Sequence, residues 1–154
     1  MKVSIITPTF NSANTIQSNL DSIKVQSFKD YQLIIIDNNS TDKTIEIIKK
    51  NNISNIKFLI EKDLGIFDAI NKGIKLSDNE LISVLHSDDF YNDENVLKNV
   101  VETFQKNKDT DIVYGNLIYV KKNNIDITLR CWKPGMYDKN SFFKGWHPPH
   151  PSFF

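Results

Sequence analysis

The sequence contains very little cysteine and arginine, with Cys131 and Arg130 the only examples in 154 residues. A single cysteine excludes an internal disulfide, which fits a reducing compartment. A single arginine argues against a phosphate-binding surface built from guanidinium groups. The formal net charge is zero, so the chain lacks the basic surplus of a nucleic-acid-binding protein, and no nucleic-acid partner is expected.

Long hydrophobic runs are missing as well. No stretch approaches the roughly 20 apolar residues that a membrane-spanning helix needs. The N-terminal segment MKVSIITPTF meets a proline too early to be the apolar part of a signal peptide. Because 40% of the residues are hydrophobic and 25% are charged, the composition predicts a cytoplasmic enzyme or binding domain with a real core.

Apolar runs alternate with helical patterns over the first 115 residues. Strands are predicted at 3–7, 31–37, 56–60, 80–85 and 111–115. Helices are expected to start at Ser12 or Asn14, at Thr41 and Asp42, close to Phe67, and near residue 94. This alternation predicts an α/β fold with a mostly parallel central sheet and helices on both faces.

The pattern changes after residue 115. The runs LIYVKK and IDITLR on either side of Asn123 and Asn124 predict a β-hairpin with a two-residue turn. The chain then stops on HPPHPSFF, with two aromatic residues just after a proline cluster. We expect the 154 residues to be the N-terminal part of a longer protein, while a natural end packed on the core stays open as the alternative.

Mostly small polar and acidic residues follow the first four predicted strands. They are Thr7, Pro8, Thr9 and Asn11, then Asp37 to Asp42, then Glu61 to Gly65, then Ser87 to Asp89. Ligands of open α/β sheets bind beyond the carboxyl ends of the strands. Such residues also form turns and helix caps. That interpretation is favoured for Thr41 and Asp42, and both interpretations stay open for Asp37.

The adjacent carboxylates of Asp88 and Asp89 stand at the end of the fourth predicted strand. Two close carboxylates raise each other's pKa unless a cation offsets their repulsion. Mg²⁺ or Mn²⁺ does so with one or two carboxylates, while phosphates and waters complete the coordination. The pair therefore indicates a divalent-cation site, with an ordinary acidic loop as the alternative.

Four segments in this order and spacing carry a family resemblance. They are MKVSIITPTFNSANTI, LIIIDNNSTDKT, EKDLGIFDAINKGI and ISVLHSDDFY. Together they resemble a family 2 glycosyltransferase, the nucleotide-sugar-dependent family with the GT-A fold. Within that family, they are similar to bacterial enzymes that build capsule, O-antigen and other surface polysaccharides. The resemblance is strong over residues 2 to about 94 and loose beyond.

The resemblance implies roles for the first two motifs in binding the nucleoside. Thr7, Pro8, Thr9 and Asn11 correspond to the loop under the nucleoside, and Asp37 to the acid that reads the base or its ribose. Asn38 replaces a frequent acidic neighbour of Asp37, which is a departure from the family pattern.

The resemblance also implies roles for the third and fourth motifs. Asp68, Asn71 and Lys72 correspond to a helix that closes over the nucleotide, although a solvated helix lysine is the favoured interpretation of Lys72. Asp88 and Asp89 correspond to the motif that holds the ribose and a Mn²⁺ or Mg²⁺ ion. Asp89 is slightly favoured as the metal ligand.

Two histidines and the missing base complete what the resemblance implies. Many relatives carry aspartate where His86 stands, and the histidine is either a third polar contact or a side chain at the sheet edge. Relatives often have a histidine in the segment of His150, which would contact the diphosphate or the acceptor. Inverting members need a general base, which is expected beyond Phe154. We therefore expect the 154 residues alone to bind nucleotide weakly at most and to transfer no sugar.

The resemblance predicts a metal-dependent, inverting glycosyltransferase of bacterial polysaccharide biosynthesis. A UDP-sugar is the favoured donor, and a saccharide or lipid-linked molecule the acceptor. A single GT-A-like domain is expected over 1–154, with 1–115 as the nucleotide-sugar-binding core and 116–154 as the hairpin and start of the acceptor side. A position at the cytoplasmic face of the inner membrane and a homodimer stay open. So do two other functions, a sugar nucleotidyltransferase and a non-catalytic carbohydrate-binding domain.

Overall fold

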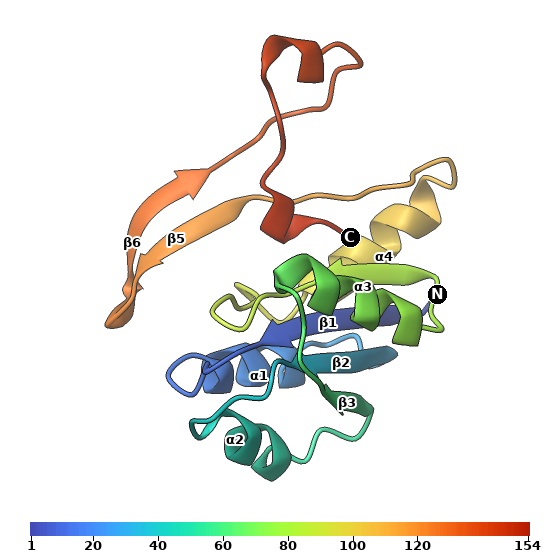
Figure 1. Cartoon of the computed structure of the whole chain (residues 1–154). Helices are drawn as coiled ribbons and strands as arrows, with labels where there is room; N and C mark the ends of the chain where they lie inside the picture. The colour runs from blue at the N-terminus through green and yellow to red at the C-terminus, as the bar shows by residue number, and fades with distance from the viewer. The chain divides into compact units, whose positions relative to one another are not determined.

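The computed structural model describes residues 1–154, which divide into two compact units, Met1–Asp109 and Thr110–Phe154. Figure 1 shows the course of the chain within each unit. The first unit alternates strands and helices, and the second is built on a β-hairpin. No helix combines the length and the apolar character needed to span a bilayer.

A four-stranded parallel sheet forms the centre of the first unit. Its strands are β1 (Val3–Thr9), β2 (Tyr31–Asp37), β3 (Ile56–Ile60) and β4 (Leu81–Val84), in the order β3-β2-β1-β4. All seven residues of β1 and the last five of β2 are buried, as expected for strands covered on both faces. The predicted parallel sheet is confirmed, and β2 and β3 have the predicted bounds.

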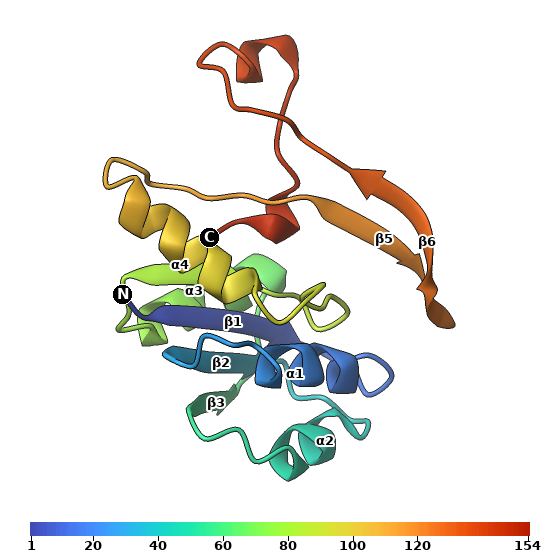
Figure 2. The same ribbon diagram turned by 180° about the vertical axis from the view of Figure 1, so that it is seen from behind.

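Helices cover both faces of this sheet, as the sequence predicts. They are α1 (Ile16–Lys24), α2 (Thr44–Lys50), α3 (Ile66–Leu76) and α4 (Val96–Lys106). Figures 1 and 2 place α3 on one face of the sheet and α1 and α4 on the other. Ile16, Leu20 and Ile23 of α1 are fully buried, because their spacing puts all three on one side of the helix.

The first helix begins later than expected. α1 begins at Ile16 rather than directly after Ser12 or Asn14. The carbonyl of Ser12 accepts the N–H groups of Thr15 and Ile16 at 3.0 and 2.9 Å. This turn occupies the residues in front of the helix, so neither predicted residue serves as its cap.

The second helix also begins later, at Thr44 rather than at Thr41 or Asp42. Asp42 accepts the N–H of Thr44 at 2.9 Å and the N–H of Ala13 at 3.0 Å. The N–H of Thr41 donates to Oδ1 of Asn11 at 2.9 Å. The Thr44 hydroxyl also donates to Asp42 and lowers the pKa of that carboxyl. Thr41 and Asp42 therefore form turns, as the favoured interpretation holds.

The strand predicted at 111–115 is absent from the sheet, so that prediction was wrong. Its residues belong to the second unit, where Tyr114 forms a single antiparallel bridge with Phe153. Val113 exchanges two backbone hydrogen bonds with Phe154, at 3.0 and 2.9 Å. A short apolar run indicates an extended segment but does not identify the strand with which it pairs.

The predicted β-hairpin is present in the second unit. Its strands β5 (Leu117–Lys121) and β6 (Asn124–Trp132) are antiparallel. The two-residue turn lies one position earlier than expected, at Lys122 and Asn123, because Asn124 already pairs with the last residue of β5.

Aromatic contacts order the rest of the second unit. The ring centroid of Trp146 lies 5.9 Å from that of Tyr114, 6.0 Å from Tyr137 and 5.6 Å from Phe142. The indole N–H of Trp146 donates to the carbonyl of Pro134 at 2.7 Å. Two short 3₁₀ helices complete the unit, η1 (Phe142–Lys144) and η2 (His150–Ser152). The indole is thus the centre of a packed aromatic cluster.

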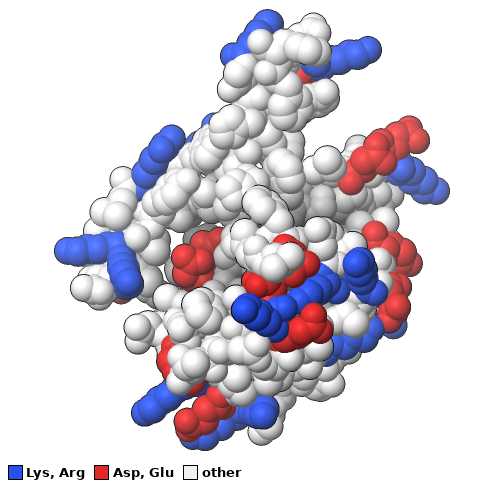
Figure 3. Space-filling view, viewed as in Figure 1, with Lys and Arg blue, Asp and Glu red and all other residues white.

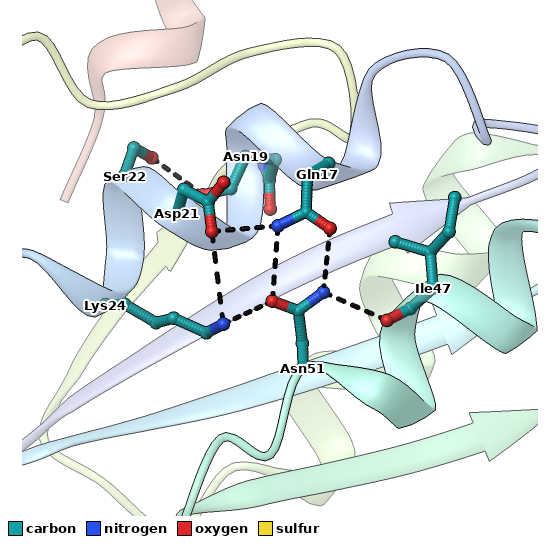
Figure 4. Close-up of polar contacts among 7 residues, drawn as sticks. All are labelled: Gln17, Asn19, Asp21, Ser22, Lys24, Ile47 and Asn51. Carbon is teal, nitrogen blue, oxygen red and sulfur yellow. Dashed lines mark hydrogen bonds and ion pairs between the residues drawn. The ribbon is translucent and has the colours of Figure 1, made fainter.

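A polar network joins α1 to the end of α2, as Figure 4 shows. Asn51 follows the last residue of α2, and its side-chain amide donates to Gln17 of α1 at 3.1 Å and to the carbonyl of Ile47 at 2.9 Å. Its side-chain oxygen accepts hydrogen bonds from Gln17 and Lys24. One asparagine therefore closes α2 and fixes it against α1.

α3 approaches β1 very closely at Gly73. A Cβ atom at Gly73 would lie 2.4 Å from Cγ2 of Ile6, much closer than two non-bonded carbon atoms can come. Ile6 is fully buried in a cluster with Ile34, Ile36 and Ala69, and its branched side chain has little freedom on a strand. The close packing of this helix on the sheet therefore requires glycine.

Gly73→Ala should destabilise the first unit. Alanine favours a helix by about 1 kcal/mol over glycine, but overpacking a core costs about 1–3 kcal/mol. We expect the free energy of unfolding in urea to fall by about 1–2 kcal/mol, and the second substitution Ile6→Ala to show strong coupling with the first. Lys75→Ala on the exposed side of α3 is the control. A Gly73→Ala variant as stable as the wild type would contradict this packing.

Candidate functional site

The strand order points to one place at the carboxyl edge of the sheet. The chain runs outward from β1 to β2 and β3 and then returns to the other side of β1 to form β4. Ligands of open α/β sheets bind outside the carboxyl ends of the strands, at such a reversal. The relevant loops follow β1 and β4, and a hydrogen bond between the hydroxyls of Ser12 and Ser87, 2.8 Å long, joins them.

Thr7, Pro8 and Thr9 lie within β1 rather than in a loop. The strand continues two residues beyond its predicted end, because Thr9 is in register with Asp37 of β2. All three residues are buried, and the hydroxyl of Thr7 has no hydrogen-bond partner. Of the residues expected under a nucleoside, Asn11 alone stands in the loop.

Asp37 is fully buried at the end of β2 and holds the following turn. Its carboxylate accepts hydrogen bonds from the hydroxyl of Thr9 and from the N–H and hydroxyl of Ser40, each 2.7 Å long. The structure therefore gives Asp37 a turn-forming role. Ser40 was not among the predicted site residues, although a serine three residues after an aspartate is typical of such turns.

Asn11 joins the loop after β1 to the loop after β2 by hydrogen bonds. Its backbone has a φ of 48°, a left-handed conformation that asparagine tolerates better than most residues. Its N–H donates to the hydroxyl of Ser40 at 2.9 Å, and its Oδ1 accepts the N–H of Thr41 at 2.9 Å. The two loops thus form one connected edge beyond the strands.

Asp88 and Asp89 lie in a tight turn after β4. The N–H of Asp89 donates to the carbonyl of His86 at 2.9 Å, which closes the turn. The side chain of Asp88 is exposed and makes no hydrogen bond or ion pair, whereas Asp89 is half-buried. The two neighbouring carboxylates therefore have different surroundings. We call residues 86–89 the acid turn.

Lys72 of α3 is held between two carboxylates. Its ammonium group lies 2.8 Å from Glu61, which follows β3, and 3.4 Å from Asp68 one helical turn earlier. Its side chain is only 18% exposed, so the interpretation of Lys72 as a solvated helix lysine was wrong. Figure 3 shows acidic and basic side chains adjoining over α3.

These contacts shift the pKa values of the ion pair. The N–H of Leu64 donates to Asp68 at 3.1 Å and is the main reason why the pKa of Asp68 lies below its ordinary value, with Lys72 adding to the effect. The hydrogen bond to Glu61 and the charge of Asp68 raise the pKa of Lys72. The ion pair is therefore stable in its charged form at neutral pH.

Gly65 and Asn38 shape the loop that leads into α3. Gly65 directly precedes the helix with a φ of 126°, a conformation that favours glycine. The Asn38 side chain accepts the N–H of Asp63 at 3.0 Å, so it ties the loop after β2 to the loop after β3. Asn71 is exposed on α3.

His86 and His150 occupy different units. His86 is half-buried at the start of the acid turn. His150 is exposed in the second unit, where it opens η2 and its carbonyl accepts the N–H of Phe153.

The acid turn fits a cation that arrives with phosphate oxygens. No three His, Cys, Asp or Glu side chains gather closely enough to form a metal site by themselves. Asp88 and Asp89 can supply one or two carboxylates, which is the number that Mg²⁺ usually takes from a protein when phosphates share its coordination.

Asn19, a fully buried residue of α1, was not among the predicted site residues. Its side-chain amide donates to the carbonyls of His86 and Asp89, both at 2.9 Å. Asn19 stands three residues after Ile16 and four before Ile23, so the helical period places it on the buried side. That spacing was the available signal.

Comparisons with known proteins agree on one family. A family model described as Glycosyl transferase family 2 matches residues 4–154. The chain is 33% identical over 124 residues to a PGL/p-HBAD biosynthesis glycosyltransferase of Mycobacterium bovis, covering 78% of this chain and 48% of that protein. It is also 33% identical over 124 residues to the Poly(ribitol-phosphate) beta-glucosyltransferase of Bacillus spizizenii, covering 76% and 19%. The chain thus spans about half the length of the mycobacterial relative.

Solved structures are similar as well. S. aureus TarS 1–349, determined with UDP-GlcNAc, matches with a TM-score of 0.68 and 29% identity over 73% of this chain and 33% of that chain. The mannosyltransferase PcManGT of Pyrobaculum calidifontis, determined with GDP-Man and Mn²⁺, matches with a TM-score of 0.64 and 22% identity, over 78% and 35%. The second likeness concerns the fold alone.

Lys72→Ala should raise the pKa of Asp68 without restoring it fully. The N–H of Leu64 remains after the substitution, and it contributes most to the shift. Because the pKa of Asp68 is lowered in the folded protein, its contacts stabilise the fold above the ordinary pKa, and that contribution disappears as the pH falls through the lowered value. A carboxyl-carbon NMR titration measures the change.

Lys50→Ala is the control for this titration, since Lys50 pairs with Glu46 on α2 instead. The pKa of Asp68 should not move in that variant. If Lys72→Ala left the pKa of Asp68 unchanged, the ion pair would have no effect on this carboxylate in solution.

Proposed function

Because the chain belongs to glycosyl transferase family 2, we propose that it binds a nucleotide-diphosphate sugar for transfer to a saccharide or lipid-linked acceptor. The family and the GT-A fold that the four sequence motifs predicted are confirmed. The proposed reaction inverts the sugar's anomeric centre by direct displacement in bacterial polysaccharide biosynthesis. The general base of that reaction is not assigned to any residue of this chain.

The single observation that carries the proposal is the acid turn at the switch between β1 and β4. The exposed carboxylate of Asp88 has no protein partner there, beside the half-buried Asp89. A divalent cation held by one or both carboxylates would neutralise the charge that develops on the departing diphosphate. Of the two acids, the exposed Asp88 is the more accessible first ligand, so we now favour it over Asp89.

The donor is proposed to be a UDP-sugar with Mn²⁺ or Mg²⁺. TarS, at 29% identity, was determined with UDP-GlcNAc and with UDP, which supports uridine over other nucleosides. The carboxylate oxygens of the acid turn are ligands of the kind that Mn²⁺ and Mg²⁺ accept.

The other residues predicted to bind the nucleotide-sugar donor have two kinds of role in the proposal. Thr9 and Asp37 shape the edge of the sheet on which the nucleoside rests, since both are buried and the hydroxyl of Thr9 donates a hydrogen bond to Asp37. Asn11, Asn71 and Lys72 lie nearer the surface and are the proposed contacts to the nucleotide. To bind a phosphate, Lys72 would have to give up its ion pair with either Glu61 or Asp68.

The second unit is proposed to begin the acceptor side, with His150 near the diphosphate or the acceptor. A lipid-linked acceptor would bring the protein to the cytoplasmic face of the inner membrane. Met136 and Phe143 are 91% and 92% exposed, and Lys139 and Lys144 stand close to them in the sequence. Exposed apolar side chains among lysines suit an anionic membrane surface.

UDP and Mn²⁺ together should raise the Tm of the protein more than either alone. A ligand that binds only the folded state stabilises it by about 2.7 kcal/mol at about 100 times its Kd. Asp88→Ala and Asp89→Ala should each remove the part of this gain that depends on Mn²⁺. Asp109→Ala, which removes one charge from an exposed residue outside these loops, is the matched control and should behave as the wild type.

Other outcomes distinguish the alternative functions. Release of pyrophosphate from UTP and a sugar phosphate would identify a sugar nucleotidyltransferase instead. Stabilisation by saccharides, with no effect of UDP and Mn²⁺, would identify a carbohydrate-binding domain.

A further inference from the structure

Three polar residues, two in α1 and one just after its end, bind the backbone of the segment following β4. They are Asn19 and Ser22, three positions apart on one side of the helix, and Gln26, two positions after the last helical residue, Lys24. We call these three residues the polar row. Asn19 and Gln26 are fully buried, and Ser22 is 9% exposed. This row lies beside the apolar row of α1, so the helix faces both the sheet and the segment.

Each member of the row contacts a different part of the segment. The N–H of Tyr91 donates to the hydroxyl of Ser22 at 3.1 Å. The amide of Gln26 donates to the carbonyl of Asp93 at 2.7 Å and accepts the N–H of Leu97 at 3.0 Å. Ser22 and Gln26 therefore hold the part of the segment that leads into α4.

Asn19 alone contacts the acid turn. Its amide nitrogen donates both of its hydrogens, one to the carbonyl of His86 and one to the carbonyl of Asp89, at 2.9 Å each. These two residues are the first and last of the turn, and the N–H of Asp89 already donates to the carbonyl of His86. One buried side chain thus fixes both ends of the turn between which Asp88 projects.

We propose that Asn19 is the positioning residue of the acid turn, so that its amide sets the geometry with which Asp88 and Asp89 meet a divalent cation. This inference rests on the proposed function. Groups that orient the ligands of a metal are worth about 10- to 100-fold in affinity. Asparagine suits the place because two carbonyl oxygens require a donor. The side-chain oxygen of Asn19 is buried without a hydrogen-bond partner. Asn19 therefore holds the turn through its amide nitrogen.

Asn19→Asp is the sharpest test, since it keeps the shape and replaces the donor by an acceptor. We expect Mn²⁺-dependent binding of UDP, measured by titration calorimetry, to weaken about 10- to 100-fold. Binding of UDP without Mn²⁺ should change much less, because Asn19 makes no hydrogen bond to Asn11, Asn71 or Lys72, the proposed contacts to the nucleotide. Should the variant not fold, Asn19→Ala, which places no charge in the core, takes its place with the same expectation.

Gln26→Glu is the matched control. It makes the same exchange of amide for acid at another fully buried residue, two positions after the end of α1, but it acts on the part of the segment beyond the acid turn. It should lower the Tm and leave the affinity for UDP and Mn²⁺ unchanged. Affinities equal to the wild type in folded Asn19→Asp and Asn19→Ala would overturn the proposal, as would an equal loss in Gln26→Glu.

A measurement without ligand separates this inference from the proposed function. Hydrogen exchange of the acid turn in the ligand-free protein should quicken in Asn19→Ala and stay unchanged in Gln26→Glu. If the wild type bound no UDP with Mn²⁺, the proposed function would fail while faster exchange still supported Asn19 as the residue that holds the turn. Unchanged exchange in Asn19→Ala would overturn the positioning role whatever the ligand does.

Discussion

The parallel pairing of β1 with β2 fixes the rest of the first unit. Seven consecutive residue pairs, from Val3 with Tyr31 to Thr9 with Asp37, join the two strands. Their apolar side chains are almost all buried, because helices cover the sheet on both faces. The pairing brings the hydroxyl of Thr9 to the carboxylate of Asp37, which also accepts two hydrogen bonds from Ser40 in the loop after β2.

α1 links this sheet to the acid turn by using two of its sides. Its isoleucine and leucine side chains are buried among the apolar residues of the core, while Asn19 and Ser22 of the helix, and Gln26 just after its end, bind backbone groups of the segment after β4. A backbone segment without regular structure must find partners for its N–H and C=O groups. The helix supplies them from side chains, and thereby gives an irregular segment a defined position.

The sequence predicted the features that depend on local pattern. The runs at 31–37 and 56–60 become strands with those bounds, since an apolar run flanked by turn residues specifies its own ends. The run at 111–115 looks the same, yet it bridges to Phe153, because pairing depends on residues distant in the chain. The ion pair between Lys72 and Glu61 and the contacts of Asn19 with the acid turn were likewise hidden, since these partners lie on different elements.

Under the proposed function, the acid turn requires a cation that the first unit does not supply. Among the residues predicted to bind the nucleotide-sugar donor, Lys72 carries a positive charge. Glu61 and Asp68 already balance that charge. The sole arginine, Arg130, belongs to the second unit, where it lies over the rings of Tyr119 and Trp132. A diphosphate added beside Asp88 and Asp89 would meet like charge. A divalent cation resolves that repulsion, because it attracts the carboxylates and the phosphates at once.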